Sequence, residues 1–264
     1  MSKIRQSPRR LGQVFLHDQN IVNKICRFAQ IEPKDNVIEI GCGRGILTKA
    51  LLDIVESLHV IEIDKACILA TQKELPNATI HFHHEDVLNM DFSKLPSPQH
   101  IVANIPYNIT TPIIEKLIQY KSHLKKAVIM VQKEVAERIT SAPCNKSYGS
   151  LSLFCQFHFE TSIGFQIPRS CFYPEPNVDS AILCLVPKPK PFDVNETTLF
   201  SVIRAAFWGR RKTLLNCLTK SPHTNYQNSI KNIPEIEPFL LKRGETLSLA
   251  DFATLVHYLE KHAS

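Results

Sequence analysis

Short apolar runs alternate with longer amphipathic runs from residue 36 to residue 140, and this alternation constrains the fold more than any other feature. The short runs have the length of a strand, and the longer runs repeat their apolar residues with the period of a helix. Strands that alternate with helices form a parallel sheet with crossover helices. The sequence therefore predicts an α/β fold built on a doubly wound, Rossmann-like sheet. The predicted strands lie in NVIEI, SLHVIEID, ATIHFHHED, HIVANIPY and KAVIMVQKE.

The pattern changes after Ser147. Residues 150–160 and 178–187 have the composition of two longer strands separated by a Pro-rich segment, and an antiparallel hairpin at one edge of the sheet explains them. From residue 188 onward helical periodicity takes over, with Ser248 as a candidate N-cap, which predicts a small all-α C-terminal domain. The predicted domains are a basic N-terminal arm at 1–20, a ligand-binding domain at 21–187 and a helical domain at 188–264.

The composition is that of a soluble globular protein. The chain has 264 residues, of which 44% are hydrophobic and 21% charged, and it contains no apolar stretch of about 18 residues that would span a membrane. Its eight cysteines form no CxxC pair and lie mostly in apolar segments, which is typical of buried thiols in a reducing compartment. The basic N-terminus is followed by no apolar signal segment. We therefore expect a cytoplasmic monomer with no membrane partner.

A glycine-rich loop follows the first predicted strand of the sheet. Gly41, Gly43 and Gly45 come directly after this strand and before a helix, so the backbone can turn sharply and approach a ligand closely. The dinucleotide fingerprint needs a further glycine where this chain has Ile46. The loop therefore favours a nucleotide-like ligand other than a nicotinamide or flavin dinucleotide.

Two acidic residues follow the next two strands. Glu62 ends the second strand, where a carboxylate can accept hydrogen bonds from both hydroxyls of a ribose. Asp86 follows the third strand and can accept a hydrogen bond from an adenine amine. Either acid alone is more simply a solvated strand end, but together with the glycine loop they describe a site for an adenosyl group without a pyrophosphate. S-adenosylmethionine is the cofactor that fits this description.

The tetrapeptide Asn104-Ile105-Pro106-Tyr107 follows the fourth strand, so it emerges beside the predicted cofactor. The lone pair of an adenine N6 amine is delocalised into the ring, and an enzyme must favour the more pyramidal nitrogen that develops during attack. The side-chain oxygen of Asn104 and the carbonyl of Ile105 are predicted to accept the two amine hydrogens, while Pro106 fixes the turn and Tyr107 stacks on the purine. Phe172 is a candidate for closing the pocket from the opposite face.

These residues resemble one family, the ribosomal RNA adenine N6,N6-dimethyltransferases, and specifically its small-subunit branch. The resemblance covers nearly the whole chain and implies a class I methyltransferase sheet in a catalytic domain at 21–187. It also implies cofactor contacts from Val14, Leu16, Gly41, Glu62, Asp86 and Asn104, with Gly43 in the same loop. Val14 stands where the family usually has Asn, and Cys42 stands where it has Pro, a change expected to alter loop rigidity more than chemistry. The motifs that carry the resemblance are LGQVFL at 11–16, EIGCGRG at 39–45, NIPYNI at 104–109, VQKEVAERI at 131–139, YGSLS at 148–152, FYP at 172–174, VDS at 178–180, AFWGRRKTL at 206–214 and RGETLS at 243–248.

By this resemblance the chain dimethylates two adjacent adenosines in the 3′-terminal hairpin of small-subunit (16S) rRNA, late in subunit assembly. Its expected partner is the small ribosomal subunit. Three alternatives stay open: a large-subunit rRNA dimethyltransferase of the macrolide-resistance type, a non-catalytic assembly or transcription factor on the same fold, and, more weakly, a DNA adenine methyltransferase.

Basic residues are concentrated in one part of the C-terminal half. Residues 181–220 contain seven Lys or Arg against two acids, while the whole chain has a net charge of +6. We expect Arg210, Arg211 and Lys212 to contact RNA phosphates, although solvated helix ends would have the same composition. His81, His83 and His84 suggest a metal site, since alternate strand residues share a face, but that strand is expected to be buried and offers no fourth ligand, so no metal is predicted.

Overall fold

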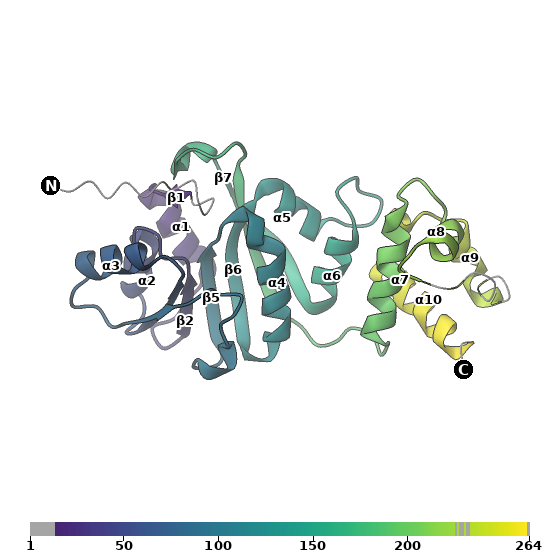
Figure 1. Cartoon of the computed structure of the whole chain (residues 1–264), viewed down its shortest axis with the longest axis horizontal. Helices are drawn as coiled ribbons and strands as arrows, with labels where there is room; N and C mark the ends of the chain where they lie inside the picture. The colour runs from purple at the N-terminus through teal and green to yellow at the C-terminus, as the bar shows by residue number, and fades with distance from the viewer. Residues whose placement is uncertain (1–13, 225, 227–229, 231–232, 263–264) are drawn as a thin grey trace. The chain divides into compact units, whose positions relative to one another are not determined.

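The computed structural model describes residues 14–224, 226, 230 and 233–262 (Figure 1). The chain divides into two compact units, one made of residues 1–136 with 160–187 and the other of residues 137–159 with 188–264. The helical unit therefore includes a segment, 137–159, that the sequence analysis assigned to the catalytic domain. Most of the predicted basic arm, with residues 11–13 of the N-terminal motif, lies outside the described residues.

A seven-stranded sheet forms the centre of the first unit. Its strands, in spatial order, are β4 (Ile80–His84), β3 (Leu58–Glu62), β2 (Asn36–Ile40), β5 (Gln99–Asn104), β6 (Leu124–Gln132), β9 (Ser180–Pro187) and β7 (Phe159–Ile167). Neighbouring strands from β4 to β6 are parallel, and β9 is antiparallel to β6. The predicted doubly wound sheet with antiparallel chain added at one edge is confirmed.

The order of the strands reverses beside β2. The chain runs outward from β2 to β3 and β4 and then returns to the other side of β2 to form β5. In open α/β sheets a ligand binds where the order reverses, outside the carboxyl ends of the strands, because the connections on the two sides diverge there. The loops that follow β2 and β5 are therefore placed to form a site.

Helices pack against the sheet. On one face, Val22 and Ile25 of α1 (Gln19–Ala29) pack with Leu47 and Leu51 of α2 (Ile46–Leu52) in the same buried cluster as strand residues such as Val102. Burial of aliphatic side chains of this kind is the main source of stability in such a sheet. The remaining helices of this unit are α3 (Lys65–Glu74), α4 (Thr110–Gln119) and α5 (Lys133–Thr140), the last of which continues into the second unit.

A separate two-stranded ladder holds the N-terminal segment in the first unit. β1 (Phe15–Leu16) pairs antiparallel with β8 (Phe172–Tyr173), with Leu16 opposite Phe172. The backbone N–H of His17 donates to the carbonyl of Cys171 and extends the pairing. Since β1 is only two residues long, its side chains must supply much of its anchoring.

The second unit is helical, as predicted. Its core contains Leu199 and Ile203 with Phe252 and Val256, all buried. Ser248 caps the last helix as expected: its hydroxyl accepts from the Asp251 N–H, and the Asp251 carboxylate accepts from the Ser248 N–H. The α-helices of this unit are α6 (Ser150–His158), α7 (Glu196–Trp208), α8 (Leu214–Lys220), α9 (Glu237–Leu240) and α10 (Leu249–Lys261).

The prediction of a strand at residues 150–158 is wrong. They form helix α6, and strand β7 begins only at Phe159. The alternation of Leu151 and Leu153 lasts for too few residues to fix a strand, whereas Leu153 and Phe157 lie four residues apart and are both buried in the helical core. The hydroxyl of Ser152 also accepts the N–H of Gly149, which favours a helix start.

Short 3-10 turns connect several of these elements: η2 (Phe92–Lys94), η3 (Tyr107–Ile109), η4 (Lys121–His123), η5 (Arg169–Cys171), η7 (Pro234–Ile236) and η8 (Gly244–Thr246). The cysteines are free thiols, and seven of the eight are buried as predicted, with Cys144 exposed. Within the described part of the chain, no helix has the length and apolar character needed to cross a membrane.

Tyr148 links the segment 137–159 to the rest of the helical unit. The side chain is 1% exposed, and its hydroxyl donates to the carbonyl of Leu247 at 2.9 Å. Replacing Tyr148 by Phe leaves this buried carbonyl without its partner, so we expect the free energy of unfolding to fall by about 1 to 2 kcal/mol. Denaturant unfolding measures this change. Tyr258→Phe, at a partly buried position in the same core, is the matched control, and equal losses in the two variants would contradict the assigned role.

Candidate active site

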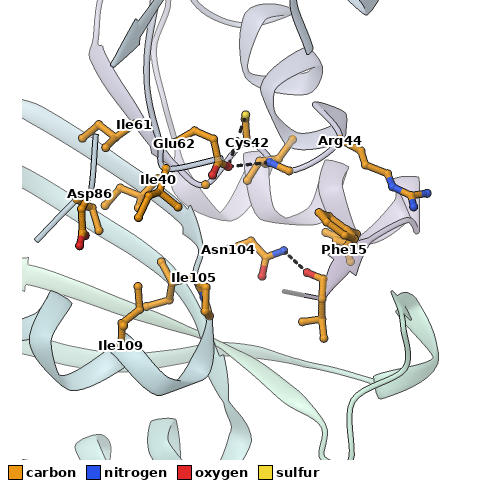
Figure 2. A pocket seen from close by; sticks show the side chains of 18 of the residues that line it. Phe15, Ile40, Cys42, Arg44, Ile61, Glu62, Asp86, Asn104, Ile105 and Ile109 are labelled. Atoms are coloured by element: carbon orange, nitrogen blue, oxygen red, sulfur yellow. Dashed lines mark hydrogen bonds between the residues drawn. The ribbon is translucent and has the colours of Figure 1, made fainter. Parts of the chain in front are cut away.

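A pocket lies at the carboxyl ends of the parallel strands, where the strand order reverses (Figure 2). Its wall is formed by the segments that follow β2, β3, β4 and β5, together with β1. All seven residues predicted to contact the cofactor line it, and one of them, Asn104, is joined there by two further residues of the predicted catalytic tetrapeptide. These residues are Val14, Leu16, Gly41, Gly43, Glu62, Asp86 and Asn104, with Ile105 and Pro106.

The glycine loop makes a close backbone wall on one side of the pocket. Gly41, Gly43 and Gly45 have φ angles of +81°, +53° and +79°, a region that residues with a Cβ seldom adopt. A Cβ at Gly41 would lie 3.1 Å from the carbonyl oxygen of Asn104. Glycine therefore permits both the turn into α2 and the close approach of the loop to the end of β5.

Glu62 is held by hydrogen bonds from the glycine loop and from its own turn. The Asp64 N–H donates to Oε1 at 2.8 Å and the Gly43 N–H donates to Oε2 at 3.4 Å. The Cys42 thiol lies 3.8 Å from the same Oε2. The side chain is 5% exposed, so its carboxylate is fixed at the inner wall of the pocket.

Two acids lie beyond the end of β4. Glu85 and Asp86 both line the pocket, and Oδ1 of Asp86 accepts the Leu88 N–H at 2.9 Å. This bond closes a turn that directs the carboxylate of Asp86 toward the pocket (Figure 2). The acidic end of the pocket can therefore accept hydrogen bonds from the amine of a ligand.

Asn104 lies at the end of β5, and only the nitrogen of its side-chain amide has a hydrogen-bond partner in the described structure. Its Nδ2 donates to the carbonyl of Val14 at 3.4 Å, which sets the orientation of the amide (Figure 2). Its Oδ1 is buried and has no hydrogen-bond partner in the described structure. A buried acceptor without a partner costs free energy, and its presence in a pocket indicates a place where a ligand supplies the donor.

Tyr107 and Phe172 do not belong to the wall of this pocket. The Tyr107 hydroxyl lies 2.7 Å from Oγ of Ser180, on β9, and burial raises its pKa above the usual value. Phe172 is 2% exposed because it pairs with Leu16 and packs in the core beneath β1. The structure thus places Phe172 behind the N-terminal segment and not across the pocket, where the sequence analysis expected it.

Sequence reasoning missed Phe15 and Arg44, which also line the pocket. The Phe15 ring lies against the glycine loop, so that a Cβ at Gly43 would meet it at 3.1 Å. The Arg44 guanidinium lies over the same ring, 5.1 Å from its centroid. Phe15 belongs to the LGQVFL motif and lies between Val14 and Leu16, two residues predicted to contact the cofactor. This position in the sequence could have indicated that Phe15 lines the pocket.

The predicted RNA-binding residues differ in their contacts. Arg210 pairs with Glu245 at 3.2 Å and donates to the carbonyl of Lys146 at 2.7 Å, so it joins two loops of the helical unit. Lys212 lies 4.4 Å from the centroid of the Trp208 ring, which is 45% exposed. Arg211 is exposed. The structure brings the three onto one segment, between α7 and α8.

The histidines of β4 lie on an edge strand, not on the buried strand that the sequence analysis expected. The rings of His81 and His83 stack on that of His59 from β3, and Nδ1 of His59 lies 3.0 Å from Nε2 of His83. Burial, followed by the neighbouring His81 and His83, lowers the pKa of His59 to about 4, so the His59 ring is neutral near pH 7. Among the residues with described positions, no three His, Cys, Asp or Glu side chains are arranged to hold a metal ion.

Comparison with known families gives an independent result. The family model described as ribosomal RNA adenine dimethylase matches residues 4–261. The chain belongs to this family. A Bacillus mycoides protein named ribosomal RNA small subunit methyltransferase A is 38% identical over 96% of this chain and 91% of its own length. The predicted family and enzyme class, an rRNA adenine dimethyltransferase, are confirmed.

Two solved structures of methyltransferases share the fold. A dimethyladenosine transferase from Plasmodium falciparum is 28% identical, with a TM-score of 0.83 over 94% of this chain and 98% of its own. The 23S rRNA methyltransferase ErmE is 23% identical, with a TM-score of 0.70 over 93% of this chain and 99% of its own, and at that identity it supports the fold alone.

Glu39, in the strand that leads to the glycine loop, makes stability depend on pH. Burial, reinforced by the charge of Glu62, raises the pKa of Glu39 to about 8. Between the unfolded pKa of 4.5 and about pH 8, the folded chain keeps a proton that the unfolded chain releases, so Glu39 lowers stability progressively as pH rises. We expect Glu39→Gln to raise the unfolding temperature relative to wild type by an amount that grows from pH 4.5 to pH 8. Exposed Glu56→Gln is the control, and a pH-independent effect of Glu39→Gln would contradict the assignment.

Proposed function

We propose that this adenine dimethylase transfers methyl groups from S-adenosylmethionine to N6 of two adjacent adenosines in the 3′-terminal hairpin of small-subunit rRNA. The observation that carries the proposal is the buried, unpartnered Oδ1 of Asn104 at the wall of the pocket. A primary amine supplies the donor that this oxygen lacks. The small-subunit target follows from the name of the relative that is 38% identical over nearly both full lengths.

The residues of the pocket fit an adenosyl cofactor. The glycine loop brings its backbone close to the end of β5, where a Cβ at Gly41 would meet the Asn104 carbonyl oxygen, and buried Glu62 provides an acceptor for ribose hydroxyls. Asp86 is placed to accept from the adenine amine, while Val14 and Leu16 contribute backbone. When bound, S-adenosylmethionine supplies a methyl group on a positively charged sulfur. No pyrophosphate contact is required of the loop, which agrees with Ile46 at the position of the missing glycine.

Asn104 and Ile105 perform the central task on the target base. The Asn104 Oδ1 accepts one hydrogen of the N6 amine, and the Ile105 carbonyl accepts the other, which favours the pyramidal nitrogen that attacks. The hydrogen bond from Nδ2 to Val14 keeps Oδ1 turned toward the pocket. The nitrogen becomes acidic once it is alkylated and loses its proton to water, so no strong base is needed.

Pro106, Tyr107 and Phe172 support this arrangement. Pro106 fixes the turn after β5, and Tyr107, tied to Ser180 through its hydroxyl, offers a ring of fixed position for the flipped purine to stack on. Because Phe172 lies opposite Leu16 in the ladder and shares its buried cluster, we assign it to holding the N-terminal segment in place.

The helical unit supplies the contact with rRNA phosphates through the segment between α7 and α8. Arg211 and Lys212 are exposed cations there, while Arg210 is partly neutralised by Glu245. Contacts of this type give salt-dependent affinity without base specificity, so recognition of the target depends on the shape of the rRNA and on the splayed base. The monomeric state and the cytoplasmic location remain predictions.

Replacing Asn104 by Ala removes the acceptor and is expected to lower kcat by about 10²- to 10³-fold, with the affinity for S-adenosylhomocysteine changed much less. Single-turnover transfer of radiolabelled methyl groups to unmethylated small-subunit particles measures the first quantity, and calorimetry measures the second. Asn77→Ala, at an exposed position after α3, is the control. A wild-type kcat for Asn104→Ala would contradict the proposed role of Asn104 as the acceptor for the N6 amine.

Replacing Arg211 by Gln is expected to weaken binding to small-subunit particles and to reduce the slope of log K against log salt by about one. Lys34→Gln removes an exposed charge from the other unit and serves as the matched control. Filter binding at several salt concentrations measures both slopes. An unchanged slope for Arg211→Gln would remove this residue from the phosphate-binding face.

A further inference from the structure

We propose that Cys42 is a positioning residue, whose thiol orients the Glu62 carboxylate toward the ribose of the cofactor. The inference rests on the proposed function of the pocket. It goes beyond the resemblance, which implied only a change in loop rigidity at this position, because it gives the thiol a polar partner.

The thiol and the carboxylate meet at the inner wall of the pocket. Cys42 is 4% exposed, lines the pocket, and has its Sγ 3.8 Å from Oε2 of Glu62 (Figure 2). An ionised carboxylate only accepts hydrogen bonds, so the thiol is the donor. The same oxygen accepts the Gly43 N–H at 3.4 Å, and the two donors therefore approach Oε2 from one loop.

The Asp64 N–H reaches the other oxygen, Oε1, at 2.8 Å. Three donors thus fix the plane of the carboxylate, and of these only the thiol is a side chain. A substitution of Cys42 can therefore change the orientation of the Glu62 carboxylate toward the ribose while both backbone donors remain.

The thiol stays protonated and remains a donor. Burial, followed by the charges of Glu39 and Glu62, raises the pKa of Cys42 far above that of a free thiol. A thiol is a weak donor, so its contribution to binding is modest, and a serine hydroxyl at the same place can replace it.

The loop itself explains why this position can act on Glu62. Cys42 lies between Gly41 and Gly43, which both have positive φ angles, so the turn directs its side chain inward. Arg44, the next residue of the loop with a side chain, extends instead over the Phe15 ring. Figure 2 shows the two side chains leaving the loop in different directions.

The test compares two ligands by calorimetry: S-adenosylhomocysteine and its 2′,3′-dideoxy analogue, which lacks the ribose hydroxyls. We expect Cys42→Ala to weaken S-adenosylhomocysteine binding by about three- to tenfold and to leave binding of the analogue unchanged. Cys42→Ser should stay within about twofold of wild type for both ligands. Cys26→Ala removes a buried thiol from the same core, away from the pocket, and should change neither affinity.

Equal weakening of both ligands by Cys42→Ala would show that the side chain only packs the loop, and no weakening of either would show that the thiol has no role; each overturns the proposal. On a Glu62→Gln background, Cys42→Ala should have no further effect. If Cys42→Ala fails to fold, Cys42→Val, which also lacks a donor, takes its place. Failure of the wild-type chain to bind S-adenosylhomocysteine would overturn the proposed function itself and this inference with it, a result distinct from any effect of the cysteine variants.

Discussion

The pairing of β2 with β3 on one side and with β5 on the other is the constraint on which the rest of the site depends. It places the loops after two strands that are distant in sequence at the same edge of the sheet and makes them diverge. Parallel pairing then brings the ends of β3 and β4 to that edge as well. Apart from the N-terminal segment with β1, the polar groups that line the pocket lie at the ends of these four strands or in the loops that follow them.

The N-terminal segment completes the pocket through contacts that the sheet does not supply. β1 has only two residues in its ladder, yet its Phe15 ring packs on Gly43, and the carbonyl of Val14, the residue before β1, fixes the Asn104 amide. The loop after β2 thus lines the pocket and also contacts the segment that orients the Asn104 amide. A small change in this loop can therefore affect cofactor affinity and methyl transfer together.

The sequence was sufficient to predict the parallel sheet, the glycine loop and the polar residues at the strand ends, because strand periodicity and chain order together fix which loops meet. It failed for residues 150–158. A few alternating apolar residues there resemble a strand pattern, but burial against the helical core favours a helix. It also failed for the strand of His81, which lies at the edge of the sheet, since burial of a strand depends on the neighbours it finds there. The contact between Cys42 and Glu62 needed atomic positions, because loop composition does not show where a side chain points.

The identity of the methylated nucleoside tests the central claim most directly. The purified protein would be incubated with radiolabelled S-adenosylmethionine and, separately, with unmethylated small-subunit particles, large-subunit particles, naked rRNA and DNA, and each product would be digested to nucleosides. The account predicts N6,N6-dimethyladenosine from small-subunit particles only. Label in large-subunit RNA or in DNA would contradict the assigned substrate, and binding of the cofactor with no label in any substrate would contradict catalysis.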